Sequence, residues 1–294
     1  MILKCFDFYG KESIKAMYDE IITSRQNSLV RQVCALSEKK ARRESGLFRF
    51  DGVKLLGEAI GANIAVKQVF FNADAGERTL DYIAAVRPEL EARGARLIAV
   101  SAAVFEKISE ERAPEGIVTV AQVPSNLCRV YAGEGDLPKI NERILIAESL
   151  RDPANLGTVM RSAYALGIDR LVLTDDCAEI YSPKTIRAAM GAAFRMPTLT
   201  VRGESLTAFI GALRESGRRV YATALYEDSL TLGEARIRGR DCFVIGNEGH
   251  GLAKKTVEAC DASVIIPMRE GAESLNAAAA AAICIWETVR AQSE

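Results

Sequence analysis

The sequence predicts an α/β fold in two domains. Its 294 residues exceed one ordinary domain, which holds about 100–200 residues. Short apolar runs alternate with longer helical patterns, and this alternation is typical of a sheet covered by helices. The segment 124–140 has little periodicity and contains two prolines and two glycines, which mark a boundary. We therefore expect domains at 1–123 and 141–294, joined by a linker at 124–140.

The first half predicts a compact α/β unit. After Gly52, the apolar residues Leu55, Leu56 and Ala59 lie on one side of an expected helix. The full set of expected elements is a basic helix from Ser24 toward Arg43, strand 47–50, a helix from Gly52, strand 66–71, helix 77–92, strand 96–100, helix 102–108 and strand 116–123.

The second half alternates more regularly and predicts a mostly parallel sheet with both faces covered. An expected helix at 155–166 ends at Gly167, a residue type that commonly terminates helices. Strands are expected at 143–147, 170–173, 196–201, 219–224, 241–245 and 262–266, with helices between them and a last helix from 274 to about 291.

The composition is that of an ordinary globular protein, with 49% hydrophobic and 26% charged residues and a net charge of −1. No apolar run reaches the roughly 18–20 residues that a membrane span requires. The start, MILKCFDFYGK, lacks the sustained apolar stretch of a signal peptide. We expect a cytoplasmic protein with no membrane segment.

The cysteines and the histidine argue against a metal site. The seven cysteines form no C-x-x-C pair, so neither a disulfide framework nor a zinc site is favoured. Several lie in apolar runs, where cysteine acts as a small hydrophobic residue. His250 is the only histidine, which excludes a site with several histidine ligands. We expect no bound metal.

Positive charge is concentrated locally, although the whole chain is nearly neutral. Local basic patches, rather than the total charge, determine attraction to phosphate. Each patch taken alone also fits a solvated helix face. Residues 25–49 hold seven basic residues against two acids, and 183–202 hold Lys184, Arg187, Arg195 and Arg202 without an acid.

Three polar segments follow expected strands, where loops of an open α/β sheet form the ligand crevice. They are 155–161, 246–251 and 266–276. The glycines of Gly246-Asn247-Glu248-Gly249-His250-Gly251 permit close backbone approach to a ligand such as an adenine edge, and also suit a simple tight turn. The sequence lacks G-x-G-x-x-G, G-x-x-x-x-G-K-[ST] and G-x-S-x-G, so classes that depend on these motifs are disfavoured.

Four segments in this order resemble one known family: NLGTVMRSAYALGIDRLVL, YSPKTIRAAMGAAFRMP, FVIGNEGHGL and IPMREGAESLNAAAAAAICIWE. Together they resemble the SpoU-type (TrmH-like) RNA ribose 2′-O-methyltransferases of the SPOUT superfamily. Residues 24–60 are similar to that family's substrate-binding extension, an RNA-binding domain similar to a ribosomal-protein fold. The resemblance implies a deep trefoil knot in the C-terminal domain, a feature that sequence patterns do not predict because knots are nearly absent from proteins.

The resemblance also implies the cofactor and the partners. S-adenosyl-L-methionine would bind within the knot, and two copies would form a homodimer with the active site at their interface. The substrate would be a structured RNA, with 23S ribosomal RNA preferred to tRNA. Alternatives are a tRNA 2′-O-methyltransferase and a non-catalytic RNA-binding or ribosome assembly factor. A nucleotide-binding enzyme that acts on a small metabolite would leave the basic stretch 25–49 unexplained.

The resemblance assigns catalysis to Arg161, Asn155, Glu248, Ser274 and Asn276. Arg161 would activate the ribose 2′-hydroxyl, and we favour an electrostatic and phosphate-clamping role because a guanidinium is a poor base. Asn155 would orient Arg161, and Glu248 would hold either of these two. Plainer interpretations are a surface cation for Arg161 and helix caps for Asn155 and Ser274.

The remaining site residues are assigned to cofactor and RNA. The cofactor residues implied by the resemblance are Gly246, Ile266, Met268 and Leu275, with Thr223 and Ala224 as weaker candidates. The expected RNA contacts are Arg187 near the site and Arg25, Asn27, Lys39 and Arg42 in the N-terminal domain. Ile266 and Leu275 also fit a purely structural role in the core.

Overall fold

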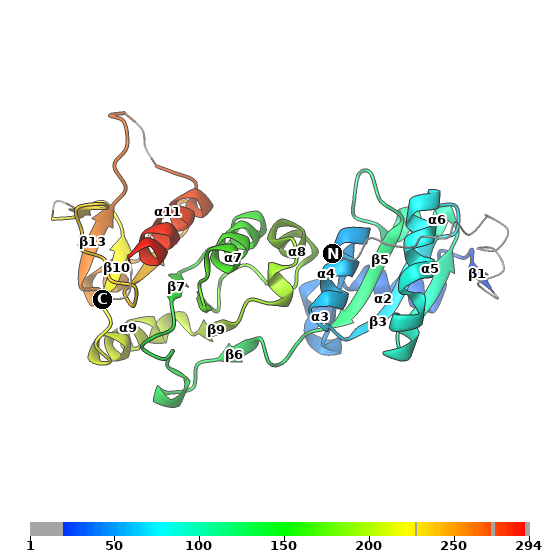
Figure 1. Ribbon diagram of the computed structural model, residues 1–294, viewed down its shortest axis with the longest axis horizontal. Coiled ribbons are helices and arrows are strands. Elements are labelled where there is room, and N and C mark those ends of the chain that lie inside the picture. The colour runs from blue at the N-terminus through cyan, green and yellow to red at the C-terminus, as the bar shows by residue number, and fades with distance from the viewer. Residues whose placement is uncertain (1–19, 227, 272–273, 292–294) are drawn as a thin grey trace. The chain divides into compact units, whose positions relative to one another are not determined.

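The computed structural model describes residues 20–226, 228–271 and 274–291. Within this range the chain forms two compact units (Figure 1). The first unit extends to Pro124 and includes Tyr181–Pro183, and the second comprises Ser125–Ile180 and the chain from Lys184 onward. Each unit is an α/β structure, as the sequence predicts.

The first unit is built on a five-stranded mixed sheet in the order β1-β4-β3-β5-β2. Strand β3 is parallel to β4 and antiparallel to β5, which also pairs with β2 in the antiparallel sense. Its strands are β1 (Ile21–Ile22), β2 (Leu47–Asp51), β3 (Val66–Asn72), β4 (Arg96–Val100) and β5 (Ile117–Gln122), and its helices are α2 (Ser28–Ala35), α3 (Lys39–Ser45), α4 (Val53–Gly61), α5 (Glu77–Ala92) and α6 (Ala102–Ile108).

The basic helix expected from Ser24 to Arg43 is two helices, α2 and α3, and not one. Asn27 caps the first, because its side-chain oxygen accepts from the Leu29 amide at 2.9 Å. Arg42 lies on the inner face of α3, is only 5% exposed, and donates to the carbonyl oxygens of Leu36 and Ser37. These bonds hold the turn between the helices, so a single continuous helix does not form.

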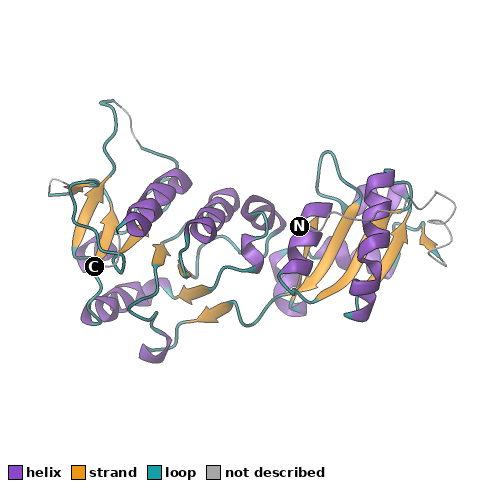
Figure 2. Cartoon of the chain, viewed as in Figure 1, coloured by secondary structure: helices purple, strands orange, loops and turns teal. Residues whose placement is uncertain are grey.

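The second unit contains an eight-stranded sheet, all of it parallel, in the order β11-β13-β10-β12-β7-β8-β9-β6. Its strands are β6 (Cys128–Val130), β7 (Ile144–Ala147), β8 (Arg170–Thr174), β9 (Thr198–Val201), β10 (Val220–Thr223), β11 (Leu230–Thr231), β12 (Cys242–Ile245) and β13 (Ala262–Ile265). The parallel sheet expected in this half is confirmed. Figure 2 shows the helices that flank these strands.

The helices of the second unit cover the sheet and bury its apolar strands. They are α7 (Pro153–Leu166), α8 (Pro183–Ala189), α9 (Leu206–Glu215), α10 (Lys254–Ala259) and α11 (Ala277–Arg290), with short 3-10 turns at Glu134–Asp136, Ala192–Phe194 and Gly203–Ser205. Helix α9 packs on the strands through Leu206, Phe209 and Leu213, all fully buried. Helix α11 lies against α7 and the strand β12.

The segment 124–140, expected as a linker, contains the edge strand β6. This strand pairs in parallel with β9, and Cys128 lies opposite Thr198. The ring of Tyr131 then packs edge-on against Phe209, with centroids 4.9 Å apart. Three residues are too few for a periodic pattern, and the pairing with β9 alone makes them a strand.

The order of the strands places β13 between β10 and β11, although both precede it in the chain. The chain therefore leaves β10, forms β11 on the far side of β13 and later returns to β12 on the other side of β10. Because all strands are parallel, the loops that follow β10, β12 and β13 meet at the same edge of the sheet. This edge carries the candidate site.

Candidate functional site

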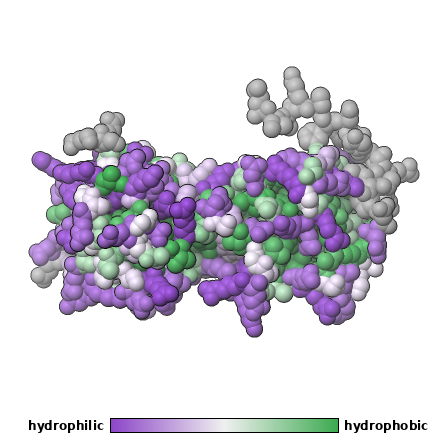
Figure 3. Space-filling view, turned by 90° about the horizontal axis from the view of Figure 1, so that it is seen from below, coloured by the Kyte–Doolittle hydropathy of each residue, from purple (hydrophilic) through white to green (hydrophobic). Residues whose placement is uncertain are grey.

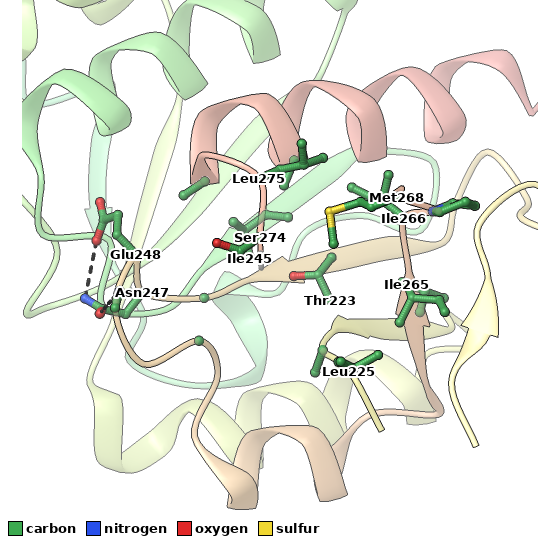
Figure 4. Close-up of a pocket in the computed structure, with 18 of the residues that line it drawn as sticks. Thr223, Leu225, Ile245, Asn247, Glu248, Ile265, Ile266, Met268, Ser274 and Leu275 are labelled. Carbon is green, nitrogen blue, oxygen red and sulfur yellow. Dashed lines mark hydrogen bonds between the residues drawn. The ribbon is translucent and has the colours of Figure 1, made fainter. Parts of the chain in front are cut away.

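A cavity of about 600 Å³ lies at the carboxyl edge of the sheet in the second unit. Its walls come from three loops, which follow β10, β12 and β13 and include residues 223–225, 245–249 and 264–271. Ser274 and Leu275, before α11, close a further side (Figure 4). Drug-sized ligand sites in proteins measure about 300–1,000 Å³, so the volume suits a cofactor of nucleoside size.

Gly246 is required because the chain folds tightly back on it. A Cβ atom added at this position would lie 2.4 Å from the carbonyl carbon of Gly251 and 2.6 Å from the amide nitrogen of Leu252. Both neighbours are backbone atoms and cannot rotate away. The glycine therefore allows the loop its closed shape beside the cavity, which Gly246 lines.

Asn247 holds this loop in place. Its side-chain oxygen accepts from the amides of Gly249 and His250, at 2.9 and 3.2 Å, and its side-chain nitrogen donates to the Ser149 carbonyl at 2.8 Å. Two backbone hydrogen bonds of 3.0 Å pair Asn247 with Gly251. The hexapeptide motif does not reveal this role of Asn247, because its partner Ser149 lies 98 positions away.

Glu148, at the end of β7, fixes the helix that follows the loop. It is 7% exposed, and its carboxylate accepts from the Ala253 amide at 3.1 Å and from the Thr256 hydroxyl at 2.8 Å. These groups belong to the first turn of α10, which has no cap of its own. No local pattern in the sequence predicts the role of Glu148, since its partners lie 105 and 108 positions along the chain.

Glu248 connects the loop with the start of α7. One carboxylate oxygen accepts from the Asp152 amide and from the side-chain nitrogen of Asn155, both at 3.1 Å, and the other accepts from Asn247 at 3.3 Å (Figure 4). The side-chain oxygen of Asn155 accepts in turn from Asn276 at 2.9 Å. Three residues named from the sequence, Asn155, Glu248 and Asn276, thus form one hydrogen-bonded chain.

The helix caps differ from the plainer interpretations of the sequence. Asp152 caps α7 by accepting from the Asn155 amide at 2.8 Å, which leaves the Asn155 side chain available for Glu248 and Asn276. Asn276, and not Ser274, caps α11 by accepting from the amides of Ala278 and Ala279. Ser274 instead lines the cavity.

Arg161 lies apart from this hydrogen-bonded chain. It follows Asn155 by six positions on α7, which places it about 120° around the helix and about 9 Å along it. Its side chain is exposed and has no hydrogen bond or ion pair within the described part of the chain. The structure therefore joins Glu248 to Asn155 and leaves the Arg161 guanidinium available to an external group.

All the residues named for the cofactor border the cavity. Figure 4 shows Thr223, Ile266, Met268 and Leu275 around it. The Thr223 hydroxyl donates to the Val244 carbonyl at 2.8 Å, which ties β10 to β12. Met268 and Leu275 are 45% and 39% exposed and form the rim, so neither is a core residue. Gly246 and Ala224 complete the set at the ends of the strands.

The residues named for RNA have varied surroundings. Arg25 pairs with Glu106 at 3.1 Å, and Asn27 is occupied as a helix cap. Lys39 and Arg187 are exposed, in the first and second unit respectively. Arg42 is a correction: its guanidinium is buried against the α2–α3 turn and is not presented to solvent. The basic pattern of the sequence could not separate Arg42 from its exposed neighbours.

Asp176 supports the backbone beneath the loop. Its carboxylate accepts from the hydroxyls of Ser149 and Thr174, at 2.6 and 2.7 Å, and from Arg151 at 3.0 Å. Burial alone would raise the pKa of Asp176, but these hydrogen bonds and the charge of Arg151 outweigh it and hold the pKa below its usual value. The cluster fixes Ser149, whose carbonyl binds Asn247.

We expect Asp176→Asn to destabilise the protein at neutral pH but not in acid. The pKa of Asp176 is lower in the folded state than the value of about 3.9 in the unfolded chain. The carboxylate therefore contributes its full stabilisation above the unfolded-state pKa, and this stabilisation is lost as the pH falls through the folded-state pKa. Urea unfolding of both proteins at a series of pH values measures the difference. A difference in the free energy of unfolding between the two proteins that stays constant down to the lowest pH would contradict this role of the Asp176 carboxylate.

The described residues contain no cluster of three or more potential metal ligands among His, Cys, Asp and Glu. Their six cysteines are free, and Cys5 lies outside the described range. Burial raises the pKa of Cys284 to about 12, which keeps this thiol protonated and inert. In the same residues, no helix has the length and apolar character needed to span a membrane.

Comparison with known proteins places both units. The SpoU rRNA methylase family model matches residues 142–286, and a model described as an MRM3-like substrate binding domain matches 27–119. The chain is 28% identical over 265 residues to the 23S rRNA (guanosine(2553)-2′-O)-methyltransferase RlmP of Bacillus subtilis, covering 90% of this chain and 97% of that protein.

Two further proteins are similar over most of their length. The 23S rRNA (guanosine-2′-O-)-methyltransferase RlmB of Pectobacterium atrosepticum is 31% identical over 228 residues, which are 76% of this chain and 89% of the relative. The S-adenosylmethionine-bound crystal structure of an rRNA methyltransferase from Sinorhizobium meliloti superimposes with a TM-score of 0.78 and 28% identity, covering 94% of this chain and 99% of that one. The chain belongs to the SpoU rRNA methylase family.

Proposed function

We propose that the protein transfers a methyl group from S-adenosyl-L-methionine to a ribose 2′-hydroxyl of 23S ribosomal RNA. The observation that carries the proposal is the hydrogen-bonded chain Glu248–Asn155–Asn276 beside a cavity bordered by all six cofactor residues named from the sequence. Relatives of this chain are named as methyltransferases for 23S ribosomal RNA, which supports the choice of substrate.

The cavity residues fit the cofactor. Gly246 lines the cavity and lets the loop close on the Gly251 backbone, and the apolar side chains of Leu225 and Met268 border the same space. Backbone groups of 246–249 and 264–268 would hold the adenosine and methionine parts. When bound, S-adenosylmethionine supplies a methyl group on a positively charged sulfur. Positioning such a group in line with its acceptor contributes up to about 7–11 kcal/mol in favourable cases.

We assign the acceptor side of the reaction to Arg161. A ribose hydroxyl is a weak nucleophile because its proton is tightly held. An exposed, unpaired guanidinium can bind the adjacent phosphate and stabilise negative charge that develops on the hydroxyl oxygen. Asn155 would act through Glu248 and Asn276 to fix the start of α7, and thereby the helix that carries Arg161.

We further propose a homodimer with the site at its interface. Tyr164, Ile283 and Trp286 are 46%, 36% and 53% exposed and lie on the neighbouring helices α7 and α11. Large exposed apolar side chains on adjacent elements are typical of a protein interface. Tyr164 follows Arg161 by three positions on α7, so a partner that covers this face would also lie against Arg161.

Two additional elements belong to the proposal. The placement of β13 between β10 and β11 supports a C-terminal trefoil knot, in which residues 224–241 encircle the later strand. The first unit, with Lys39 exposed on α3, would bind RNA, and a ribosomal RNA substrate would place the enzyme in the cytoplasm. No feature of the described residues favours a tRNA substrate over ribosomal RNA, or a non-catalytic role over methyl transfer.

The decisive experiment maps ribose methylation in total RNA from cells with and without the protein. We expect one 2′-O-methyl mark in 23S ribosomal RNA to depend on it, and calorimetry to show binding of S-adenosylmethionine to the purified protein. If the protein-dependent mark is found in tRNA, the substrate is tRNA and not 23S ribosomal RNA. If the protein binds the cofactor but no mark depends on it, the non-catalytic alternative is favoured. Absence of cofactor binding would refute the proposed chemistry.

A further inference from the structure

A second hollow, of about 570 Å³, lies in the second unit at the edge of the sheet opposite the cofactor cavity. It is bordered by Ile140, Asn141 and Arg143 before β7, by Asp169 before β8 and by 238–240 before β12. Each of these segments immediately precedes a strand, whereas the cofactor loops follow their strands. Figure 3 views the molecule from the side where β7 begins, and hydrophilic side chains dominate that surface.

Three arginines border this hollow: Arg143, Arg238 and Arg240. Within the described residues, none of their guanidinium groups makes a hydrogen bond or ion pair. Asp169 is the acid that borders the same space, and one of its carboxylate oxygens already accepts from the Arg143 amide at 2.7 Å. The hollow therefore has an excess of positive charge with unused hydrogen-bond donors.

A buried arginine builds the walls of the hollow. Arg218 is 1% exposed and donates to the carbonyl oxygens of Lys139, Glu142 and Arg240, at 2.8 and 3.0 Å for the first two. It thus ties the segment before β7 to the segment before β12. Burial lowers the pKa of Arg218, but a guanidinium remains charged in proteins, and these three partners are neutral carbonyls. Arg218 therefore adds a fixed positive charge next to the half-buried Arg143 and the exposed Arg238 and Arg240.

The donors select phosphate among anions. Guanidinium forks match the paired oxygens of phosphate, and several arginines around one hollow suit the closely spaced phosphates of a nucleic acid or of pyrophosphate. No aromatic side chain borders the hollow among the described residues, so it provides no surface for stacking a base. The ligand is thus recognised through its phosphate groups.

We propose that the hollow formed by Arg143, Arg238 and Arg240 is a phosphate-binding pocket that holds the backbone of the RNA substrate away from the methyl-transfer site. The identification of RNA rests on the proposed function, whereas the phosphate chemistry does not. Strands of four residues, such as β7 and β12, separate the two edges of the sheet by roughly 13 Å. A large folded RNA readily bridges that distance, and free phosphate compounds are the other source of the same ligand group.

The test compares the double substitution Arg238→Gln/Arg240→Gln with Arg236→Gln. The control substitution Arg236→Gln removes one positive charge from the same loop, but Arg236 does not border the hollow. Calorimetry with inorganic pyrophosphate measures the pocket itself. Filter binding of unmodified 23S ribosomal RNA across a salt series measures RNA contacts, and a titration with S-adenosylmethionine monitors the distant cavity. The substituted side chains border an open hollow, and thermal unfolding verifies that each variant is folded.

We expect pyrophosphate binding by the parent protein and by Arg236→Gln, and its loss in the double variant. RNA affinity of the double variant should fall about tenfold, and the slope of its logarithm against log salt should decrease by about 2, since each phosphate contact contributes about 1. Cofactor affinity should stay unchanged in every variant.

Loss of pyrophosphate binding with unchanged RNA affinity would support the pocket and assign it to free phosphate compounds. A parent protein that does not bind pyrophosphate, together with unchanged RNA affinity and salt slope in the double variant, would overturn the proposal. A parent protein that fails to bind S-adenosylmethionine would refute the proposed function instead, and the pyrophosphate titration would still decide the pocket.

Discussion

Arg161→Ala is expected to abolish nearly all methyl transfer while leaving the fold and cofactor binding intact. The guanidinium is exposed and without a partner among the described residues, so its removal breaks no internal contact. Loss of a group that activates the nucleophile or stabilises its charge costs about 10²–10⁴-fold in kcat. Single-turnover transfer to RNA, with thermal unfolding and cofactor titration alongside, measures the three quantities separately.

The matched control is Arg202→Ala, which removes a 72% exposed arginine from the same unit. It should leave turnover nearly unchanged. Mixing Arg161→Ala with Glu248→Ala protomers also tests the interface: restored transfer would show that Arg161 serves the cavity of the partner subunit. Normal turnover by Arg161→Ala alone would remove this residue from the mechanism.

Gly246→Ala is expected to lose cofactor binding and to destabilise the second unit. The new Cβ atom would approach the Gly251 backbone to 2.4 Å, so the loop 247–251 must move. Forced overpacking of this kind costs about 1–3 kcal/mol of folding free energy. We expect affinity for S-adenosylmethionine to fall more than about 100-fold, which corresponds to about 2.8 kcal/mol. Calorimetry and urea unfolding provide the two measurements.

Gly249→Ala is the matched control for this prediction. A Cβ atom at Gly249 would meet only the Asn247 side-chain oxygen, at 3.6 Å, which is ordinary contact. The control should keep both stability and most of the cofactor affinity. Equal effects of the two substitutions would show that glycine composition of the loop matters rather than the close approach at Gly246.

The elements with a clear apolar pattern were predictable from the sequence. The helices at 77–92 and 102–108 and the strand at 96–100 have the expected bounds, because each carries enough apolar residues to define a period. The edge strands β1, β6 and β11 were not predicted. They have two or three residues each, and only pairing with a neighbouring strand makes them strands.

The site divides in the same way. Local chemistry in the sequence identified Gly246, Asn155, Glu248 and Asn276 as polar or conformationally special residues at the ends of expected elements, and the resemblance named their chemistry. The sequence alone could not show that Asn155 bonds to both Glu248 and Asn276, 93 and 121 positions away. Burial separates two basic residues that look alike in the sequence, since Arg42 is buried and Lys39 is exposed.

By itself, the sequence determined the α/β class and the family, because these depend on short-range periodicity and on ordered local motifs. The tertiary structure alone decided which loops share the cavity at the carboxyl edge of the sheet and which arginines have no partner among the described residues. It also revealed that Arg218 joins two distant segments into a basic hollow. The physical reason is that hydrogen bonds and burial form between residues far apart in the chain, and no local pattern encodes their geometry.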